Sequence, residues 1–189
     1  MPRTTFYGQI NVQVTIQPNI GLDAGDRQSV VEILNLLLAD EAVLLLKTHR
    51  VDGHANGVEI PELQALYDDQ YKQINANSDE IGERIHILGG SQLSGSEQLI
   101  EYARLGGELN EFPGIVNILA DHEAFIRFLR EDARKCSESY DDQGTYALLV
   151  NVMRTHEKMA WILRSHVAAG QFIGEKSGDT NEKRSGIMD

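Results

Sequence analysis

The sequence predicts an all-α protein, a four-helix bundle with one crossover between the second and third long helices. Three observations favour this fold class. Four long segments repeat apolar residues at helical spacing, two of the breaks between them are short and turn-rich, and the middle connection is long and glycine-rich. A length of 189 residues and a hydrophobic content of 41% are sufficient for one domain with a sizeable core.

Residues 1–26 carry little helix signal, and we expect them to form an extended arm. Apolar residues alternate with polar ones from Ile10 to Ile16, and Pro18 then breaks this strand-like pattern. The first long helix is expected from Asp26 to Val51, where a broad apolar stripe predicts burial on more than one side.

The second long helix is expected from Pro61 to Gly90. A turn-rich break, Asp52–Gly57, precedes it, and Pro61 suits the first helical turn, where its missing N–H costs nothing. In the long connection that follows, capping residues at 94–97 predict a short helix from Gln98 to Leu105. A connection of this length permits a crossover.

The third and fourth long helices are expected from Pro113 to Tyr140 and from Thr145 to Ala169, joined by a turn at 141–144. The polar, mixed-charge end of the chain cannot form a core. We therefore expect an arm at 1–26, a bundle at 27–170 and a flexible polar tail at 171–189.

The charge balance favours cations as partners. The formal net charge is −12, which makes a nucleic-acid surface an unfavourable default. The single cysteine, Cys136, cannot form an intramolecular disulfide, and the first ten residues lack the apolar core of a signal peptide. The most apolar stretch, Ser29–Lys47, contains three acidic residues, which argues against a membrane span. We expect a cytoplasmic protein.

Four residues of metal-ligand type share one face of the second predicted helix: Asp68, Asp79, Glu83 and His86. Their successive separations of eleven, four and three residues are close to whole turns of an α-helix, so the side chains line up. A solvated acidic face gives the same pattern in any acidic protein, and the spacing alone does not separate the two interpretations.

Several blocks stand in an order and spacing that resemble one known family. They are Leu44–Thr48, Asp68–Tyr71, Asp79–Arg84, Leu88–Gly90, Asp142–Thr145 and His156–Trp161. The family is that of the Dps miniferritins, the ferritin-like DNA-binding proteins from starved cells. The resemblance covers about residues 27–170, without gaps from Leu44 to Gly90.

This resemblance implies a dodecameric cage that oxidises Fe(II) with hydrogen peroxide or dioxygen, stores the ferric mineral and protects against oxidative stress. It implies a di-iron site at a two-fold interface, with two histidines and an aspartate from one subunit and an aspartate and a glutamate from the other. The carboxylates match Asp68, Asp79 and Glu83. The histidine positions carry Asp52 and Gln64 instead, so this chain is an atypical member.

A rearranged site can offset the missing histidines. If Asp68 meets Asp79 and Glu83 across a two-fold axis, the two helices run antiparallel, and position 64 faces roughly positions 83–87 of the partner. His86 lies in that window, and Asp52 offers a carboxylate where the family has its other histidine. Fe(II) accepts both ligand types, with zinc as a competitor. Alternatively, Asp52 is a turn residue and His86 is a partly exposed or interface histidine. Gln64 either donates a hydrogen bond to a ligand carboxylate or is exposed to solvent.

Other readings remain open. The chain is alternatively a non-catalytic cage that holds zinc or sequesters iron, or a plain bundle for partner contacts.

DNA binding is not expected, because neither end of the chain is strongly basic. His122-Glu123 and His156-Glu157 are set aside as structural, since adjacent residues diverge on a helix. Asp141 and Asp142 either line an acidic pore or form a turn with a helix N-cap.

Overall fold

The computed structural model describes residues 17–49, 54–55, 58–59, 61–106 and 114–168. It confirms the all-α fold. The elements are α1 (Ala24–His49), β1 (His54–Ala55), β2 (Val58–Glu59), α2 (Pro61–Ile87), α3 (Ser96–Tyr102), α4 (Ile115–Glu138) and α5 (Gln143–Ala168). The polar tail and most of the expected arm lie outside the described residues. Among those residues, no helix combines the length and apolar character needed to cross a membrane.

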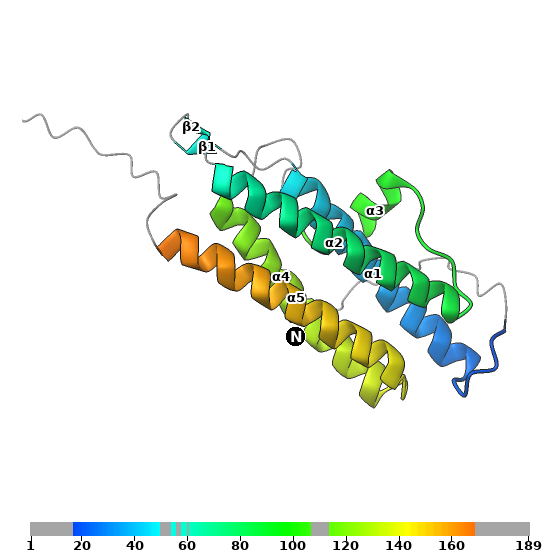
Figure 1. Cartoon of the computed structure of the whole chain (residues 1–189). Coiled ribbons are helices and arrows are strands. Elements are labelled where there is room, and N and C mark those ends of the chain that lie inside the picture. The colour runs from blue at the N-terminus through cyan, green and yellow to red at the C-terminus, as the bar shows by residue number, and fades with distance from the viewer. Residues whose placement is uncertain (1–16, 50–53, 56–57, 60, 107–113, 169–189) are drawn as a thin grey trace, which may run out of the picture.

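The four long helices form two pairs, α1 with α2 and α4 with α5, which face each other across the core (Figure 1). Phe125, Leu34, Leu37 and Ile74 are among the largest fully buried side chains. Each such side chain contributes roughly 1.5–3 kcal/mol through burial. The breadth of the apolar stripe in α1 is explained by its position, because α1 contacts α2, α3 and α4.

The break before α2 contains a short antiparallel pair of strands where we expected only a turn. β1 pairs with β2 in the register His54↔Glu59 and Ala55↔Val58. The two intervening residues in the sequence are Asn56 and Gly57, the dipeptide typical of two-residue hairpin turns. The Asn-Gly dipeptide therefore predicts a hairpin at this break, whereas we expected only a turn.

Helix α2 ends in a glycine cap. Gly89 has φ +82°, and hydrogen bonds run from Gly90 N to Ile85 O and from Gly89 N to His86 O. This is the Schellman pattern, in which a glycine in the left-handed region satisfies the last carbonyls of a helix. A Cβ at Gly90 would lie 2.6 Å from Cγ1 of Val31, so this glycine also allows the chain to pass close to α1.

The crossover is held in place by buried ion pairs. Arg104, just after α3, binds Asp40 of α1 at 2.8 Å and Asp132 of α4 at 2.7 Å, and its guanidinium lies 4.4 Å from the centre of the Phe128 ring. Asp40 also accepts hydrogen bonds from the backbone N–H groups of Arg104 and Leu105. Burial raises the pKa of Asp40, and Arg104 partly offsets this. These contacts fix the connection against α1 and α4.

The turn between α4 and α5 decides between the two roles considered for Asp142. Its side chain is 1% exposed and caps α5, with Oδ1 accepting from Thr145 N at 2.8 Å. Arg84 of α2 binds the same carboxylate at 2.7 Å. Asp142 is therefore an N-cap bound to α2, whereas Asp141 is exposed with φ 49°.

Candidate metal-binding face of helix α2

The predicted ligands in α2 all lie on its outer side. Asp68, Asp79, Glu83 and His86 are exposed, whereas Leu63, Tyr67, Ile74, Ile81 and Ile85 point into the core. At ~100° per residue, the four exposed side chains fall within an arc of about 60°. Asp52 lies outside the described residues.

The row is too long to act as one site within a single chain. Asp68 and Asp79 are eleven residues apart in sequence, which is about 16 Å along the axis at ~1.5 Å per residue. Asp79, Glu83 and His86, by contrast, follow one another at about one turn. Within the described ranges, no group of three or more His, Cys, Asp or Glu residues is arranged to hold a metal ion. The structure brings three predicted ligands near one end of α2 and leaves Asp68 toward the other.

Within the described residues, the carboxylates on this face have no basic partner. The described ion pairs of the chain do not include Asp68, Asp79 or Glu83. Among the described hydrogen bonds, the three carboxylates take part in one, from Asn75 Nδ2 to Asp79 at 3.2 Å. An acidic face without lysine or arginine partners attracts cations.

His86 is positioned by the connection that follows α2. The chain turns at Gly89-Gly90 and places the Gln92 amide 3.0 Å from Nε2 of His86. This amide lies over Gly82, where a Cβ would come within 2.4 Å of Gln92 Nε2. The Gln92 atom at this contact is the amide nitrogen Nε2, which donates to Nε2 of His86 when the ring proton is on Nδ1.

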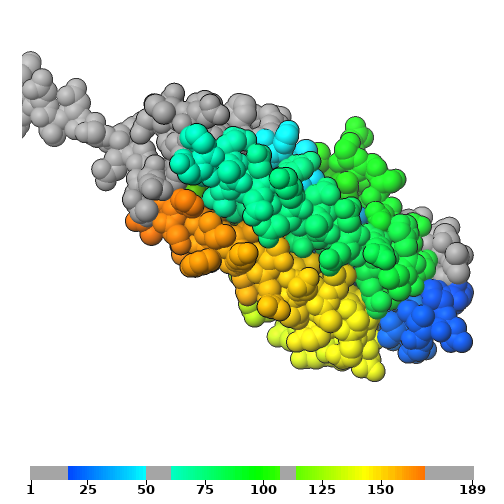
Figure 2. All heavy atoms as spheres, viewed as in Figure 1, coloured from blue at the N-terminus to red at the C-terminus, as the bar shows by residue number. Residues whose placement is uncertain are grey.

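Several large apolar side chains of the described residues are exposed to solvent. They come from α1, α2 and α3: Leu46, Tyr71, Ile87 and Ile100 are 37–47% exposed. Figure 2 shows that α2 and α3 are both visible on this side of the molecule. Apolar residues beside an acidic row are the composition expected of a face that contacts another protein.

A second polar group was missed by the sequence-based reasoning. Glu41, Asn77, His122 and His156, here called the core cluster, come one each from α1, α2, α4 and α5 and are at most 6% exposed. His156 Nε2 lies 3.0 Å from Glu41 Oε1 and 3.2 Å from Asn77 Nδ2, and the two Nδ1 atoms of His122 and His156 lie 2.9 Å apart. Helical spacing by itself predicts that these residues point into the core. We considered His122 and His156 only as members of adjacent pairs with Glu123 and Glu157, and the inward positions were therefore overlooked.

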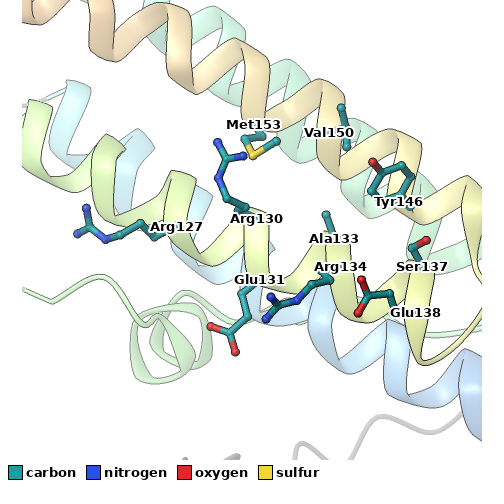
Figure 3. A pocket seen from close by; sticks show the side chains of 10 residues that line it. All are labelled: Arg127, Arg130, Glu131, Ala133, Arg134, Ser137, Glu138, Tyr146, Val150 and Met153. Atoms are coloured by element: carbon teal, nitrogen blue, oxygen red, sulfur yellow. The ribbon is translucent and has the colours of Figure 1, made fainter.

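A groove lies elsewhere, between α4 and α5, with a volume of about 500 Å³. Arg127, Arg130 and Arg134 line it from α4, and Tyr146, Val150 and Met153 line it from α5 (Figure 3). Arg130 is engaged by Glu157 at 2.7 Å, and the three arginines do not converge on one point. Two carboxylates, Glu131 and Glu138, also line the groove, but the three arginines in the same lining oppose the binding of a cation.

Comparison with known proteins gives a consistent match. The ferritin-like domain family matches residues 31–173. An uncharacterized low temperature-induced protein of Nostoc is 35% identical over 153 residues, which cover 79% of this chain and 86% of that protein. A Bacillus anthracis protein named DNA protection during starvation protein 2 is 29% identical over 143 residues, covering 73% of this chain and 96% of that protein.

Solved structures agree with the sequence matches. DpsC from Streptomyces coelicolor superposes with a TM-score of 0.73 at 25% identity, covering 82% of this chain and 92% of that chain. The fold, the order of the helices and the extent of the match all coincide with the bundle described above.

Proposed function

Because the chain belongs to the ferritin-like family, as a Dps miniferritin, we propose that it stores iron and protects its cell from oxidative damage. Iron is the substrate and the cargo. The exposed acidic row on α2 supports this function, since carboxylate oxygens bind Fe(II) and stabilise Fe(III).

The proposed reaction is ferroxidation. Two Fe(II) ions each give one electron to a molecule of hydrogen peroxide, which takes up two protons and leaves as two water molecules. With dioxygen, four Fe(II) ions supply the electrons and four protons complete the water. The ferric product is then stored within a dodecameric cage.

The proposed iron ligands are Asp52, Asp68, Asp79, Glu83 and His86. One observation carries this proposal: Asp68 is far from the other three ligands of α2 within one chain, yet all lie on one exposed face. An antiparallel copy of α2 across a two-fold axis would bring Asp68 of one subunit to Asp79 and Glu83 of the other. His86 then replaces an imidazole lost at Gln64.

Stopped-flow oxidation of Fe(II), followed by absorbance with peroxide and separately with dioxygen, tests the site. We expect Glu83→Ala and His86→Ala to slow oxidation about tenfold or more, because each removes a ligand. Glu80→Ala is the matched control, since Glu80 is an exposed acid of the same helix outside the row. An unchanged rate and iron stoichiometry in His86→Ala would remove His86 from the site, and the same result in Glu83→Ala would place the site elsewhere.

A non-catalytic cage that binds zinc or sequesters iron is the alternative. It is favoured by the absence of histidine at positions 52 and 64 and by the contact of Gln92 with the His86 ring. Calorimetry separates the two functions: tight Zn(II) binding without Fe(II) turnover supports the alternative.

We also propose that the protein forms a homo-oligomer through the α2 face and does not bind duplex DNA tightly. The residues before 27 contain only one basic side chain, Arg3, and the net charge of the chain is −12. A particle mass near twelve times that of one chain supports the cage. Strong, salt-sensitive retardation of duplex DNA in a mobility-shift assay would contradict the second statement.

A further inference from the structure

The core cluster links all four long helices through one chain of polar contacts. Glu41 of α1 and Asn77 of α2 both contact Nε2 of His156, and the opposite nitrogen of that ring contacts His122 of α4. We propose that this cluster is an acid-sensitive lock, which joins the helices at neutral pH and opens the bundle when it takes up an additional proton.

The charge of the cluster is balanced internally. Glu41 and His156 are both 0% exposed, and Oε1 of Glu41 lies 3.0 Å from Nε2 of His156. A buried carboxylate without a positive partner is very costly. One proton shared between Glu41 and His156 removes that cost, so the cluster requires this proton to remain neutral overall.

The contact between the two histidines fixes the number of protons. Two Nδ1 atoms 2.9 Å apart form a hydrogen bond only if one carries a proton and the other does not. Burial, together with the neighbouring His156, lowers the pKa of His122 well below its usual value, which keeps this ring neutral in the folded protein. A further proton on His122 would turn the contact into a repulsion between two donors.

Charged residues next to the cluster do not relieve this repulsion. Beside His122 on α4, Asp121 is paired with Lys47 at 2.8 Å and Glu123 with Arg164 at 2.6 Å. Beside His156 on α5, Glu157 is paired with Arg130 at 2.7 Å. From α1 the cluster is faced by Glu41 and from α2 by the uncharged Asn77. Phe125 packs edge-on against the His156 ring at 4.8 Å and offers no counter-charge.

The direction of the pH effect follows from the neutral state of His122. In the unfolded chain a histidine takes up a proton below about pH 6.5. Because folded His122 does not, unfolding takes up a proton in that range, and the equilibrium constant for unfolding rises about tenfold per pH unit for each proton. The contribution of His122 to stability is thus fully present above about pH 6.5 and is lost as the pH falls.

Urea unfolding of the metal-free full chain between pH 8 and pH 5 tests the lock independently of iron chemistry. We expect the unfolding constant to rise about tenfold per unit below pH 6.5. His122→Leu should lose most of that dependence, whereas His49→Gln, at an exposed histidine, should keep it. An equal pH dependence in the native chain and in His122→Leu would overturn the proposal.

A second measurement needs no variant. Hydrogen–deuterium exchange at the C2 position of each histidine, followed by mass spectrometry, reports the protonation of individual rings in the native protein. His122 should exchange slowly, with a midpoint well below those of exposed His49 and His86. A His122 midpoint equal to theirs would contradict a neutral, locked ring.

Discussion

The side-chain amide of Gln92 lies 3.0 Å from Nε2 of His86, and it occupies the space that a side chain at position 82 would fill. The contact depends on three features of the same region: the helical Gly82, the Schellman cap at Gly89, and the return of the chain along α2. The orientation of the proposed ligand His86 is therefore set by residues outside the acidic row.

Substitution of this glycine should separate the orientation of His86 from the stability of the fold. In Gly82→Ala the new methyl group displaces the flexible end of Gln92, while the helix gains up to about 1 kcal/mol from the better helix former. We expect unchanged or higher thermal stability together with weaker metal binding, measured by calorimetry.

The matched control is Gly25→Ala, because Gly25 is also helical and has nothing within 4 Å of its added Cβ. It should gain stability and leave metal binding unaltered. Metal affinity equal to that of the native chain in Gly82→Ala would show that Gln92 does not position the ring.

Substitution of Gly90, in the connection that follows α2, should lower the stability of the fold, unlike substitution of Gly82. In Gly90→Ala the Cβ would lie 2.6 and 2.7 Å from the two methyl groups of Val31, a stiff β-branched residue inside the core. Overpacking of this kind costs roughly 1–3 kcal/mol, so the urea midpoint should fall. The double variant Val31→Ala/Gly90→Ala should recover part of that loss relative to the sum of the single changes. Strict additivity would argue against a direct clash.

The cap of α5 predicts a large loss of stability from one carboxylate. Asp142→Ala removes the acceptor of Thr145 N and Oγ1 and leaves Arg84 without its partner at 2.7 Å. Loss of one member of a buried pair costs about 3–5 kcal/mol, and we expect a decrease of that order in the free energy of unfolding.

Asp141 provides the control for this change. Its φ of 49° lies in the left-handed region, and its side chain is exposed. Asp141→Gly should be neutral or stabilise by up to about 1 kcal/mol, because glycine adopts this conformation without steric cost. Equal urea midpoints for Asp142→Ala and Asp141→Gly would show that the cap does not stabilise the fold.

The helices were predictable because their apolar residues recur at helical spacing and their ends carry glycine, proline or capping residues. α2 illustrates this: Pro61 begins it, and Gly89-Gly90 follows its last residue, Ile87. The boundaries of α3 and α5 differ from expectation by about two residues at their starts, where Gly95 and Asp142 serve as the N-caps. Local sequence does not fix which of several polar residues becomes the cap.

The sites were predictable only in part. The spacing of Asp68, Asp79 and Glu83 placed them on one exposed face. Whether a second copy of the chain completes a site there depends on long-range packing, which periodicity does not encode. The core cluster was missed for a related reason. His122 and His156 come from helices whose pairing must be known before the 2.9 Å contact can be inferred.

Cys136 offers a test of the core next to the α4–α5 turn. Burial raises the pKa of its thiol to about 12, and the carboxylates of Asp132 and Asp142 act in the same direction. The folded protein thus keeps the thiol protonated at pH 8, whereas an unfolded cysteine ionises above about pH 8.5. Iodoacetamide should react slowly with the native chain and rapidly in concentrated urea.

The same shift predicts a pH dependence opposite in direction to that of His122. Because unfolding releases the thiol proton above about pH 8.5, the contribution of Cys136 to stability is complete below that value. As the pH rises further, this contribution falls, and the unfolding constant rises by up to about tenfold per pH unit. Urea unfolding between pH 8 and pH 9.5 measures this below the usual tyrosine range. Cys136→Ala should be less stable throughout, since it leaves a small cavity, but should lose this slope. An equal slope in both proteins would show that the thiol is already ionised in the folded state or that another group controls the change.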